Sequence, residues 1–251
     1  MRLRPLTAVL TFLLIVGLPV TIQAQSNHVL EWGVDIGDEY TYVLQKAFFA
    51  NQNYRDVAVA VFPFIAGLEL GQKAILSVDA LDEIPNPINE SSQMPISSCS
   101  MTRGNDSVSI ETDLRGFVVP IGDWEFLTEM TNITDMSGVT LIDTEEEWGT
   151  KGTATFQAGD GSVVTVSIEI RYEKENGTLN YLRERYSTLG TDLIDIIVVN
   201  WHPGMPTVLA AGIQLEVILI ISIGAVVGLI ISSLIYIGRK KKKSIVQQLG
   251  E

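Results

Sequence analysis

Residues 217–237 form an unbroken run without a charged side chain, and this run restricts the fold more than any other feature. At ~1.5 Å of rise per residue, such a helix crosses the ~30 Å apolar core of a bilayer. The residues that follow directly are Gly238, Arg239, Lys240, Lys241, Lys242 and Lys243. Because cations flank spans on the cytoplasmic side, we expect a transmembrane helix over 213–238 and a cytoplasmic tail over 239–251. The same cations can contact anionic lipid headgroups.

The amino terminus has the order of a secretory signal. Arg2 and Arg4 precede an apolar run from Leu6 to Val20, and a short polar segment ends at Ala24. A short membrane anchor is the alternative, but Gly17 and Pro19 interrupt the run and make it poor for spanning a bilayer. Both ends therefore predict a cleaved signal over 1–24 and a type I single-pass protein of the plasma membrane, with its amino-terminal domain outside.

Small residues recur at every fourth position of the expected span, at Gly224, Gly228 and Ser232. They share one face of a helix and would allow two spans to approach closely, so self-association is one possible role. Small residues are also common in spans that do not associate, so this alternative stays open.

The expected exterior domain is strongly acidic. Residues 25–212 hold 28 of the 30 Asp and Glu residues and ten of the 17 Lys and Arg residues, a net charge of −18. Such a surface repels nucleic acid, so we expect no nucleic-acid partner. The remaining partners are the membrane lipids around the span and an unknown extracellular ligand or protein.

Few residues offer catalytic or metal-binding chemistry. Cys99 is the only cysteine, so no internal disulfide is expected, and its Ser-rich surroundings supply no base to activate a thiol. The two histidines, His28 and His202, lie near opposite ends of the expected domain and have no metal-ligand spacing. Gly-x-Ser-x-Gly, His-Glu-x-x-His and phosphate-loop motifs are missing from the sequence. We therefore expect no catalytic residue and no cofactor.

The exterior domain carries four Asn-x-Ser/Thr motifs, at Asn89, Asn105, Asn132 and Asn176. All four lie in polar or turn-like context, which fits a glycosylated surface protein. The motif is short and chance matches are common, so each position is a candidate only.

Strand patterns dominate the exterior domain. In residues 163–172, every second residue from Val164 to Tyr172 is apolar, which is typical of a strand with one face in the core. Turn residues separate this segment from its neighbours, and 150–201 read as a four-stranded antiparallel meander. The segment 193–201 is apolar on both faces, as in a strand covered on both sides.

Three further strands are expected upstream, over 40–49, 55–65 and 73–82. The connection 83–107 is long and rich in proline, so it reads either as an exposed functional loop or as a hinge between two halves. Residues 25–202 are thus expected to form a mainly β domain (α+β minor) with an antiparallel sheet, either flat or curved, followed by a stalk over 203–212.

The sequence Ile-Gly-Asp occurs twice, at 36–38 and 121–123. After Asp38 the apolar residues alternate, so the first copy introduces a strand. After Asp123 they do not, and Asp123 suits the N-cap of a short helix near 124–131. Because one motif starts two different elements, we interpret it as turn chemistry rather than as a repeated site.

Taken together, the segments "WGVDIGDEYTYVLQKAFF", "PIGDWEFLTEM", "YEKENGTLNYLRERY" and "NWHPGMPT", followed by a span and a basic stop, resemble uncharacterised single-pass surface proteins of archaea. This resemblance implies no activity and no functional residues. The segment "NGTLNYLRERY" also resembles the glycine-turn strand of LolA-like half-barrels. That likeness implies a curved antiparallel sheet that holds acyl chains.

These observations favour a non-catalytic module for binding or display at the cell surface. The alternative is a curved-sheet carrier or sensor of a lipid-like ligand, and a lesser alternative is an extracytoplasmic hydrolase with scattered catalytic residues. The segment "DTEEEW" at 143–148 could bind calcium, although consecutive acids usually form a solvated edge. The tryptophans could stack on sugars, although large aromatics near strand ends more often fill the core: Trp32, Trp124, Trp148 and Trp201.

Overall fold

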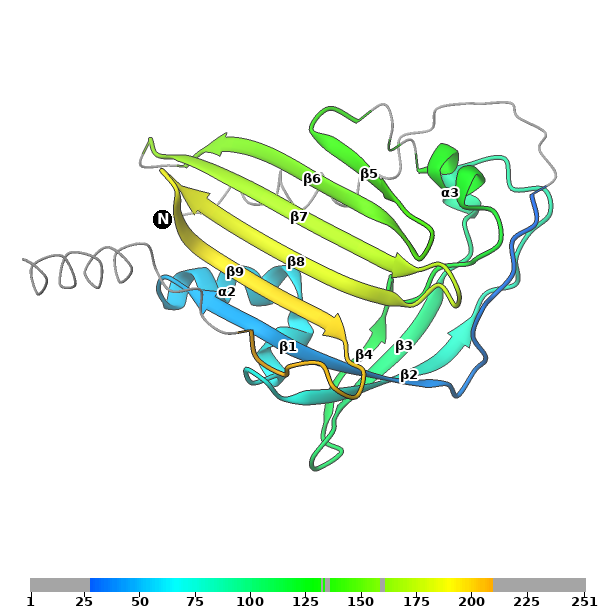
Figure 1. The fold of residues 1–251 in the computed structure, drawn as a ribbon, viewed down its shortest axis with the longest axis horizontal. Helices are drawn as coiled ribbons and strands as arrows, with labels where there is room; N and C mark the ends of the chain where they lie inside the picture. Colours follow the sequence, from blue (N-terminus) through cyan, green and yellow to red (C-terminus); the bar gives the residue numbers. More distant parts are fainter. Residues whose placement is uncertain (1–27, 132, 134–135, 159–160, 210–251) are drawn as a thin grey trace, which may run out of the picture. The chain divides into compact units, whose positions relative to one another are not determined.

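The computed structural model describes residues 28–131, 133, 136–158 and 161–209 (Figure 1). Nine strands form one antiparallel sheet in the order β4-β3-β2-β1-β9-β8-β7-β6-β5. The strands are β1 (Glu39–Phe49), β2 (Lys73–Leu81), β3 (Ser97–Arg103), β4 (Ser109–Leu114), β5 (Val139–Asp143), β6 (Glu147–Gln157), β7 (Val163–Glu173), β8 (Leu179–Thr188) and β9 (Thr191–Asn200). The prediction of a mainly β, antiparallel domain is confirmed.

The carboxyl-terminal strands β6, β7, β8 and β9 follow one another in the sheet as they do in the sequence. This confirms the meander expected over 150–201. The turn between β7 and β8 includes Asn176, whose side-chain oxygen accepts a 2.8 Å hydrogen bond from the Thr178 amide. Gly177 has a φ of +75°, a conformation that glycine adopts at little cost.

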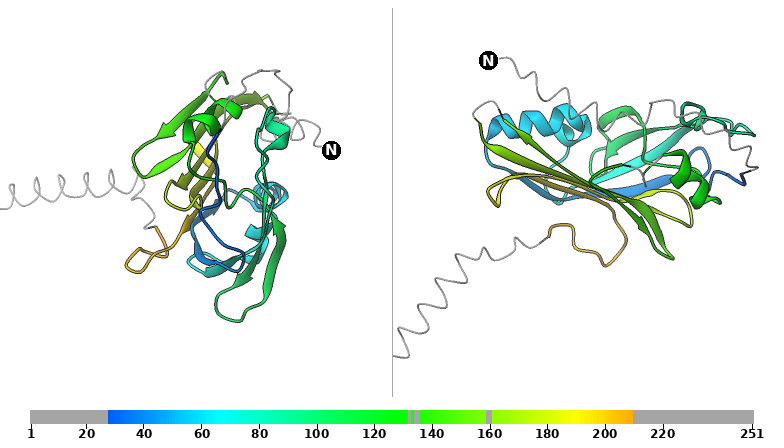
Figure 2. Two further views of the ribbon diagram at one scale, coloured as in Figure 1. Left: turned by 90° about the vertical axis from the view of Figure 1, so that its right-hand side faces the viewer. Right: turned by 90° about the horizontal axis from the view of Figure 1, so that it is seen from above.

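The sheet is curved, and the helix α2 (Gln52–Val61) and the 3₁₀ turn η1 (Pro63–Gly67) lie on its concave side (Figure 2). The strand expected over 55–65 is therefore wrong. Asn51 caps α2 by accepting a 3.3 Å hydrogen bond from the Tyr54 amide. Tyr54, Val57 and Ala58 then share one helical face and pack on the core of the sheet.

The long irregular connection expected over 83–107 is also shorter than predicted. Residues 97–103 form β3, which pairs with β2 along its length. Residues 82–96 connect these two strands and include only the short 3₁₀ turn η2 (Ser91–Gln93). The described strands before and after this connection belong to one sheet.

The strand β9 is covered on both faces, as its apolar sequence predicts. On the concave side Ile194, Ile196 and Val198 join the main core with α2 and η1. On the convex side Ile197 and Val199 pack beneath the segment 201–209.

This segment includes part of the expected stalk, and it lies against β1. The Gln45 side chain donates to the Pro206 carbonyl at 2.7 Å, and the Leu209 amide donates to the Gln45 carbonyl at 3.0 Å. Residues 203–209 are thus held on the sheet.

The two Ile-Gly-Asp segments have the two different roles that the sequence indicates. The Asp38 carboxylate accepts from the Asp35 amide at 2.9 Å and closes the turn before β1. The Asp123 carboxylate accepts from the Phe126 amide at 2.9 Å and caps the helix α3 (Trp124–Met130). The short helix expected near 124–131 is confirmed.

Across the described ranges, no helix is both long and apolar enough to cross a membrane. The expected signal over 1–24, the span over 213–238 and the basic tail over 239–251 lie outside the described residues.

Candidate apolar binding site

A cavity of about 310 Å³ lies on the concave side of β6 and β7. The side formed by β7 includes Val166, Ile168 and Ile170. The opposite side comes from β5 and the segment that precedes it, and consists of Ile133, Met136 and Val139. Both sides are aliphatic, so the cavity has the character of an apolar binding site.

The cavity exists because β6 carries small side chains where β7 carries large ones. Ala154 lies opposite Val166, Gly152 opposite Ile168, and Thr150 opposite Ile170. Directly opposite residues in an antiparallel pair point to the same face of the sheet. The small residues of β6 therefore leave space above the strand that the larger residues of β7 border.

Two glycines of β6, Gly149 and Gly152, differ in the space that a side chain would find at their positions. A side-chain Cβ on Gly149 would lie 2.0 Å from the Ile170 carbonyl oxygen, so the backbone itself demands glycine there. A Cβ on Gly152 would meet only the Val139 side chain, at 3.8 Å, which is ordinary contact. The strand pairing therefore does not require glycine at position 152. Its missing side chain instead leaves the cavity open.

The end of the cavity near α3 is built from aromatic rings. Trp148 lines the cavity and is 5 % exposed. Its indole N–H donates to the Thr128 hydroxyl at 2.9 Å, and its ring lies 5.4 Å from that of Trp124. The Tyr172 hydroxyl donates to the Gly116 carbonyl at 2.9 Å. These bonds satisfy the polar atoms of the rings and leave their apolar faces to the cavity.

The polar groups around the cavity are few. Among the described residues that line it, the side-chain hydroxyls belong to Thr131, Thr150, Thr153 and Tyr172. None of these lining residues is Asp, Glu, Lys, Arg or His. The cavity can therefore accept an apolar chain without burying an unpaired charge in its wall.

A buried carboxylate lies on the concave face beside the cavity. Glu184 on β8 is 1 % exposed, and neither of its carboxylate oxygens has a hydrogen-bond partner. Its neighbours across the sheet are Ile168 on β7 and Ile196 on β9. Burial raises the pKa of Glu184 to about 7, and the nearby Tyr186 hydroxyl offsets only part of this effect.

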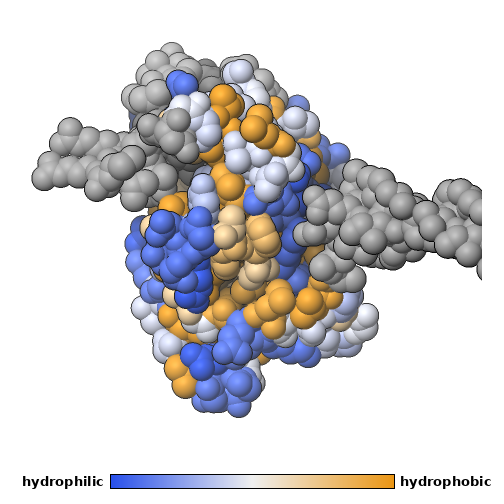
Figure 3. Space-filling model, turned by 90° about the vertical axis from the view of Figure 1, so that its left-hand side faces the viewer, coloured by the Kyte–Doolittle hydropathy of each residue, from blue (hydrophilic) through white to orange (hydrophobic). Residues whose placement is uncertain are grey.

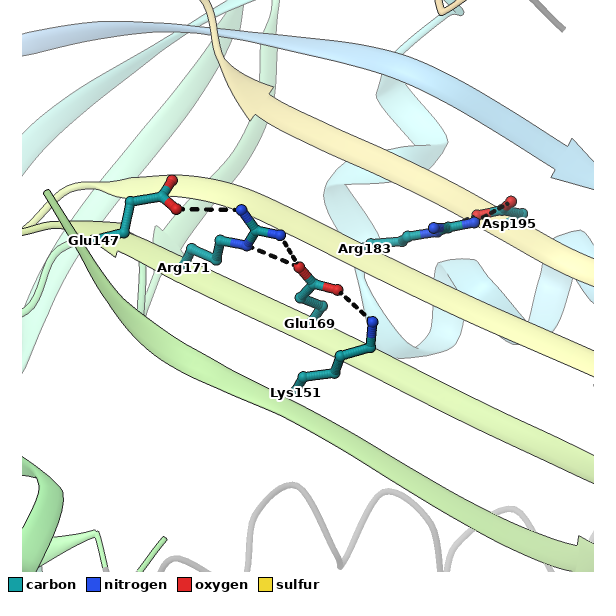
Figure 4. A network of polar contacts seen from close by, with 6 residues as sticks. All are labelled: Glu147, Lys151, Glu169, Arg171, Arg183 and Asp195. Carbon is teal, nitrogen blue, oxygen red and sulfur yellow. Dashed lines mark hydrogen bonds and ion pairs between the residues drawn. The ribbon is translucent and has the colours of Figure 1, made fainter. Parts of the chain in front are cut away.

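The convex face of the same strands carries a chain of ion pairs (Figure 4). Lys151 contacts Glu169 at 3.2 Å, and Arg171 binds Glu169 through its Nε at 2.8 Å. Arg171 also binds Glu147 at 3.2 Å. Burial raises the pKa of Glu169, but its bonds to Arg171 and Lys151 hold the pKa below its usual value. Each of these charges is paired within the sheet, so we do not assign this face a ligand.

A second group on the convex face surrounds a fully buried carboxylate. Asp195 on β9 accepts two hydrogen bonds from Arg183 and is also paired with Lys46. Burial alone would raise the pKa of Asp195, but its bonds to Arg183 and Lys46 hold the pKa below its usual value.

The candidate glycosylation sites differ in their surroundings. Asn89 and Asn105 are exposed and lie outside the strands. The Asn176 side chain is occupied by the turn before β8: it donates to Glu173 at 3.1 Å and accepts from the Thr178 hydroxyl at 2.7 Å. Asn132 lies outside the described residues, as do the candidate association residues Gly224, Gly228 and Ser232 and the cations from Arg239 to Lys243.

The other residues that the sequence singles out do not form a reactive centre. Cys99 is a buried free thiol, and burial raises its pKa to about 11. His202 contacts Glu173 at 3.4 Å, away from the cavity lining. In the parts of the chain that the structure describes, no group of three His, Cys, Asp or Glu residues could hold a metal ion.

The tryptophans have separate local roles. Trp124 and Trp148 pack together beside the cavity, Lys73 lies 3.2 Å above the ring of Trp201, and the Trp32 N–H donates to the Asp82 carbonyl at 2.8 Å. Two of the four thus border or support the site.

The sequence interpretation missed both the cavity and Glu184, although each has a sequence signal. The small residues of β6 stand in an otherwise ordinary strand. In β8, Glu184 occupies a position between Leu182 and Tyr186, which both face the core. In a strand that alternates apolar and polar residues, a charged residue at an apolar position indicates a buried charge, and Glu184 is such a residue.

Hydrophobic residues also reach the surface at the end of the domain that carries α2. Figure 3 shows them there between hydrophilic regions. The most exposed large hydrophobic residue of the described chain is Leu189, in the turn between β8 and β9. A single exposed turn residue is common in soluble domains and defines no site.

Comparison of the chain with known proteins identifies no relative: no family model, no curated protein and no solved structure matches it.

Proposed function

We propose that residues 25–209 form an extracytoplasmic module that binds an apolar, lipid-like ligand and that a carboxyl-terminal span holds it at the plasma membrane. The observation that carries this proposal is the aliphatic cavity on the concave side of β6 and β7. Of the functions that the sequence leaves open, the curved-sheet carrier or sensor is the one that requires such a cavity.

The size and lining of the cavity indicate the class of ligand. Its volume of about 310 Å³ is at the lower end of the range of small-molecule sites. Because the lining carries no charged side chain, the part of the ligand that enters must be uncharged. A single alkyl chain or a small apolar molecule meets both conditions.

The membrane setting rests on the sequence. The apolar run over 217–237 and the cations after it support a span, and the positive and apolar start supports export. Since the module would then lie close to lipid, alkyl-chain ligands would be abundant around it. A display module without a ligand and a hydrolase remain the competing functions, and neither accounts for an open apolar cavity.

Photo-labelling of the full chain in lipid nanodiscs tests the proposal. The probe is a dodecyl chain that carries a diazirine, and the labelled residues are mapped by peptide mass spectrometry. We expect labels on the cavity strands β6 and β7. Gly152→Leu should remove them, because its side chain fills the cavity without a backbone clash.

The matched control is Thr155→Leu, which places the same side chain on the same strand. Thr155 is exposed, lies opposite Thr165 and is not among the cavity residues. Labelling of β6 and β7 should persist in this variant. Equal labelling of Gly152→Leu and the unchanged protein, or no label on these strands, would overturn the proposal.

A further inference from the structure

Glu184 lies one side chain away from the cavity. Ile168, which lines the cavity, is its direct partner across β7 and β8, so the two side chains stand next to each other on the concave face. Val166, another lining residue, has the same relation to Tyr186. Ile168 is only partly buried, and the cavity lies on its other side.

The fold has no evident structural use for this carboxylate. Glu184 is 1 % exposed, and neither of its oxygens makes a hydrogen bond of normal geometry. The nearby Tyr186 hydroxyl offsets only part of the effect of burial on its pKa, so it does not replace a full partner. Asp195 on the neighbouring strand is buried as deeply but binds Arg183 and Lys46. An unpaired buried carboxylate costs stability, so its presence in a natural sequence requires an explanation, and a bound cationic partner is one that would satisfy it.

We infer that Glu184 is the polar anchor of the ligand site and that the ligand is an amphiphile with an alkyl chain and a cationic ammonium head. The chain occupies the cavity between β5, β6 and β7. The head passes Ile168 and donates its N–H bonds to the Glu184 oxygens. This inference rests on the proposed function, because it assigns a ligand class to the same cavity.

Charge supports a cationic head over the alternatives. A carboxylate accepts hydrogen bonds and repels anions, so a fatty-acid head is disfavoured beside Glu184. The net charge of −18 over residues 25–212 also attracts cations to the domain and repels anions. An ammonium head would stabilise the ionised form of Glu184, which burial alone disfavours, whereas a hydroxyl head adds no positive charge to balance that form.

Ile168 separates the cavity from Glu184. The side chain of Ile168 must change its rotamer, and such changes are common when a protein binds a ligand. Ile168→Ala should connect the cavity with Glu184 directly. We therefore expect a diazirine-bearing dodecylamine to label Ile168→Ala more strongly than it labels the unchanged protein.

Competition on the full chain in nanodiscs tests the head group. The diazirine dodecyl probe reports occupancy of β6 and β7, and the competitors are dodecylamine, dodecanol and dodecanoate. We expect dodecylamine to compete about tenfold better than dodecanoate, the size expected for one charge-assisted hydrogen bond. Glu184→Gln and Glu184→Leu should each reduce this preference to within about threefold, because neither provides a negative charge.

The matched control is Asp192→Asn, which removes one negative charge from the neighbouring strand β9 while leaving Glu184 in place. It should keep the preference, because Asp192 pairs with Arg185 on the convex face. If all competitors act equally on the unchanged protein, or if the amine preference survives in Glu184→Gln, the inference is wrong. Preference for dodecanol over dodecylamine would also overturn it.

Failure of the inference and failure of the proposed function are distinguishable. Labelling that Gly152→Leu removes, but that shows no head-group preference, contradicts the role of Glu184 alone. Labelling that Gly152→Leu does not affect contradicts the cavity itself and therefore both.

Discussion

Arg183 on β8 binds Asp195 on β9 through two parallel hydrogen bonds, each 2.9 Å long. The Asp195 side chain is 0 % exposed, and Arg183 keeps 32 % of its surface exposed. Removing the buried partner would leave the cations of Arg183 and Lys46 without their acceptor. We therefore expect Asp195→Ala to lower the free energy of unfolding by about 2 to 4 kcal/mol, measured by urea denaturation.

The comparison variant is Asp192→Ala on the same strand. Asp192 pairs with Arg185, and both side chains are more exposed, at 26 % and 42 %. Solvent weakens such a pair, so its loss should cost at most about 1 kcal/mol. Equal losses in the two variants would show that burial does not govern these pairs.

Acid should unfold the protein partly through Asp195. Its pKa is lower in the folded state than the usual 3.8, because the bonds from Arg183 and Lys46 outweigh burial. The stabilisation is therefore complete above the unfolded pKa and is lost as the pH falls through the folded pKa. We expect Asp195→Asn to flatten the acid limb of the stability curve, measured by circular dichroism below pH ~4. An unchanged acid limb in this variant would contradict the assignment.

Glu184 should have the opposite pH dependence. Burial raises its pKa from 4.5 to about 7, so the folded state holds a proton that the unfolded state releases. Stability should therefore fall as the pH rises from ~4.5 to ~7, by up to about 3 kcal/mol for this group. The measurement is urea denaturation of the unchanged protein and Glu184→Gln across this range. Their difference isolates Glu184 from the two histidines, and parallel curves would contradict a raised pKa.

Individual strands could be predicted from the sequence, because the alternation of apolar and polar residues within a strand shows which of its faces is buried. The alternation from Val164 to Tyr172 predicts β7, and the doubly apolar β9 predicts its cover on both sides. The segment 55–65 could not be assigned in this way. Its valines fit a period of two, whereas Tyr54, Val57 and Ala58 also fit a helix, and the concave surface of the sheet favours the helix.

The candidate site depends on pairing between strands, which a single sequence does not specify. Gly152 opens a cavity only because it lies between its two cross-strand partners, Ile168 on β7 and Val139 on β5. In the same way, Glu184 looks like one member of a solvated charge run with Arg183 and Arg185 until the strand faces are assigned. Its neighbours Leu182 and Tyr186 show that it faces the core.

Glycosylation should distinguish the candidate asparagines. Expressed in a host with the transferase, the protein should carry glycans at the exposed Asn89 and Asn105. Asn176 should carry none on the folded domain, because its side chain is bonded to Glu173 and Thr178 and Thr178 is 0 % exposed. Gel mobility before and after enzymatic deglycosylation checks this. Asn89→Gln and Asn105→Gln should each reduce the change in gel mobility by the contribution of one glycan. A reduced change in mobility for Asn176→Gln would contradict the prediction.

The two Ile-Gly-Asp turns should tolerate substitution unequally, although both glycines have a positive φ, +96° at Gly37 and +103° at Gly122. A Cβ on Gly37 meets nothing within 4 Å, so Gly37→Ala bears only the conformational cost of about 1 kcal/mol. A Cβ on Gly122 would lie 2.3 Å from the Val29 carbonyl oxygen. Gly122→Ala must therefore also displace the chain near Val29, and we expect a loss of at least about 3 kcal/mol.

Thermal unfolding of the two alanine variants provides the measurement, and a lower melting temperature for Gly37→Ala than for Gly122→Ala would contradict it. Photo-labelling of the cavity strands β6 and β7 provides a second comparison of the two alanine variants. Gly122 and Asp123 precede α3, whose Thr128 holds the cavity residue Trp148. Gly122→Ala should therefore weaken probe labelling of β6 and β7, whereas Gly37→Ala, at the start of β1, should leave it unchanged.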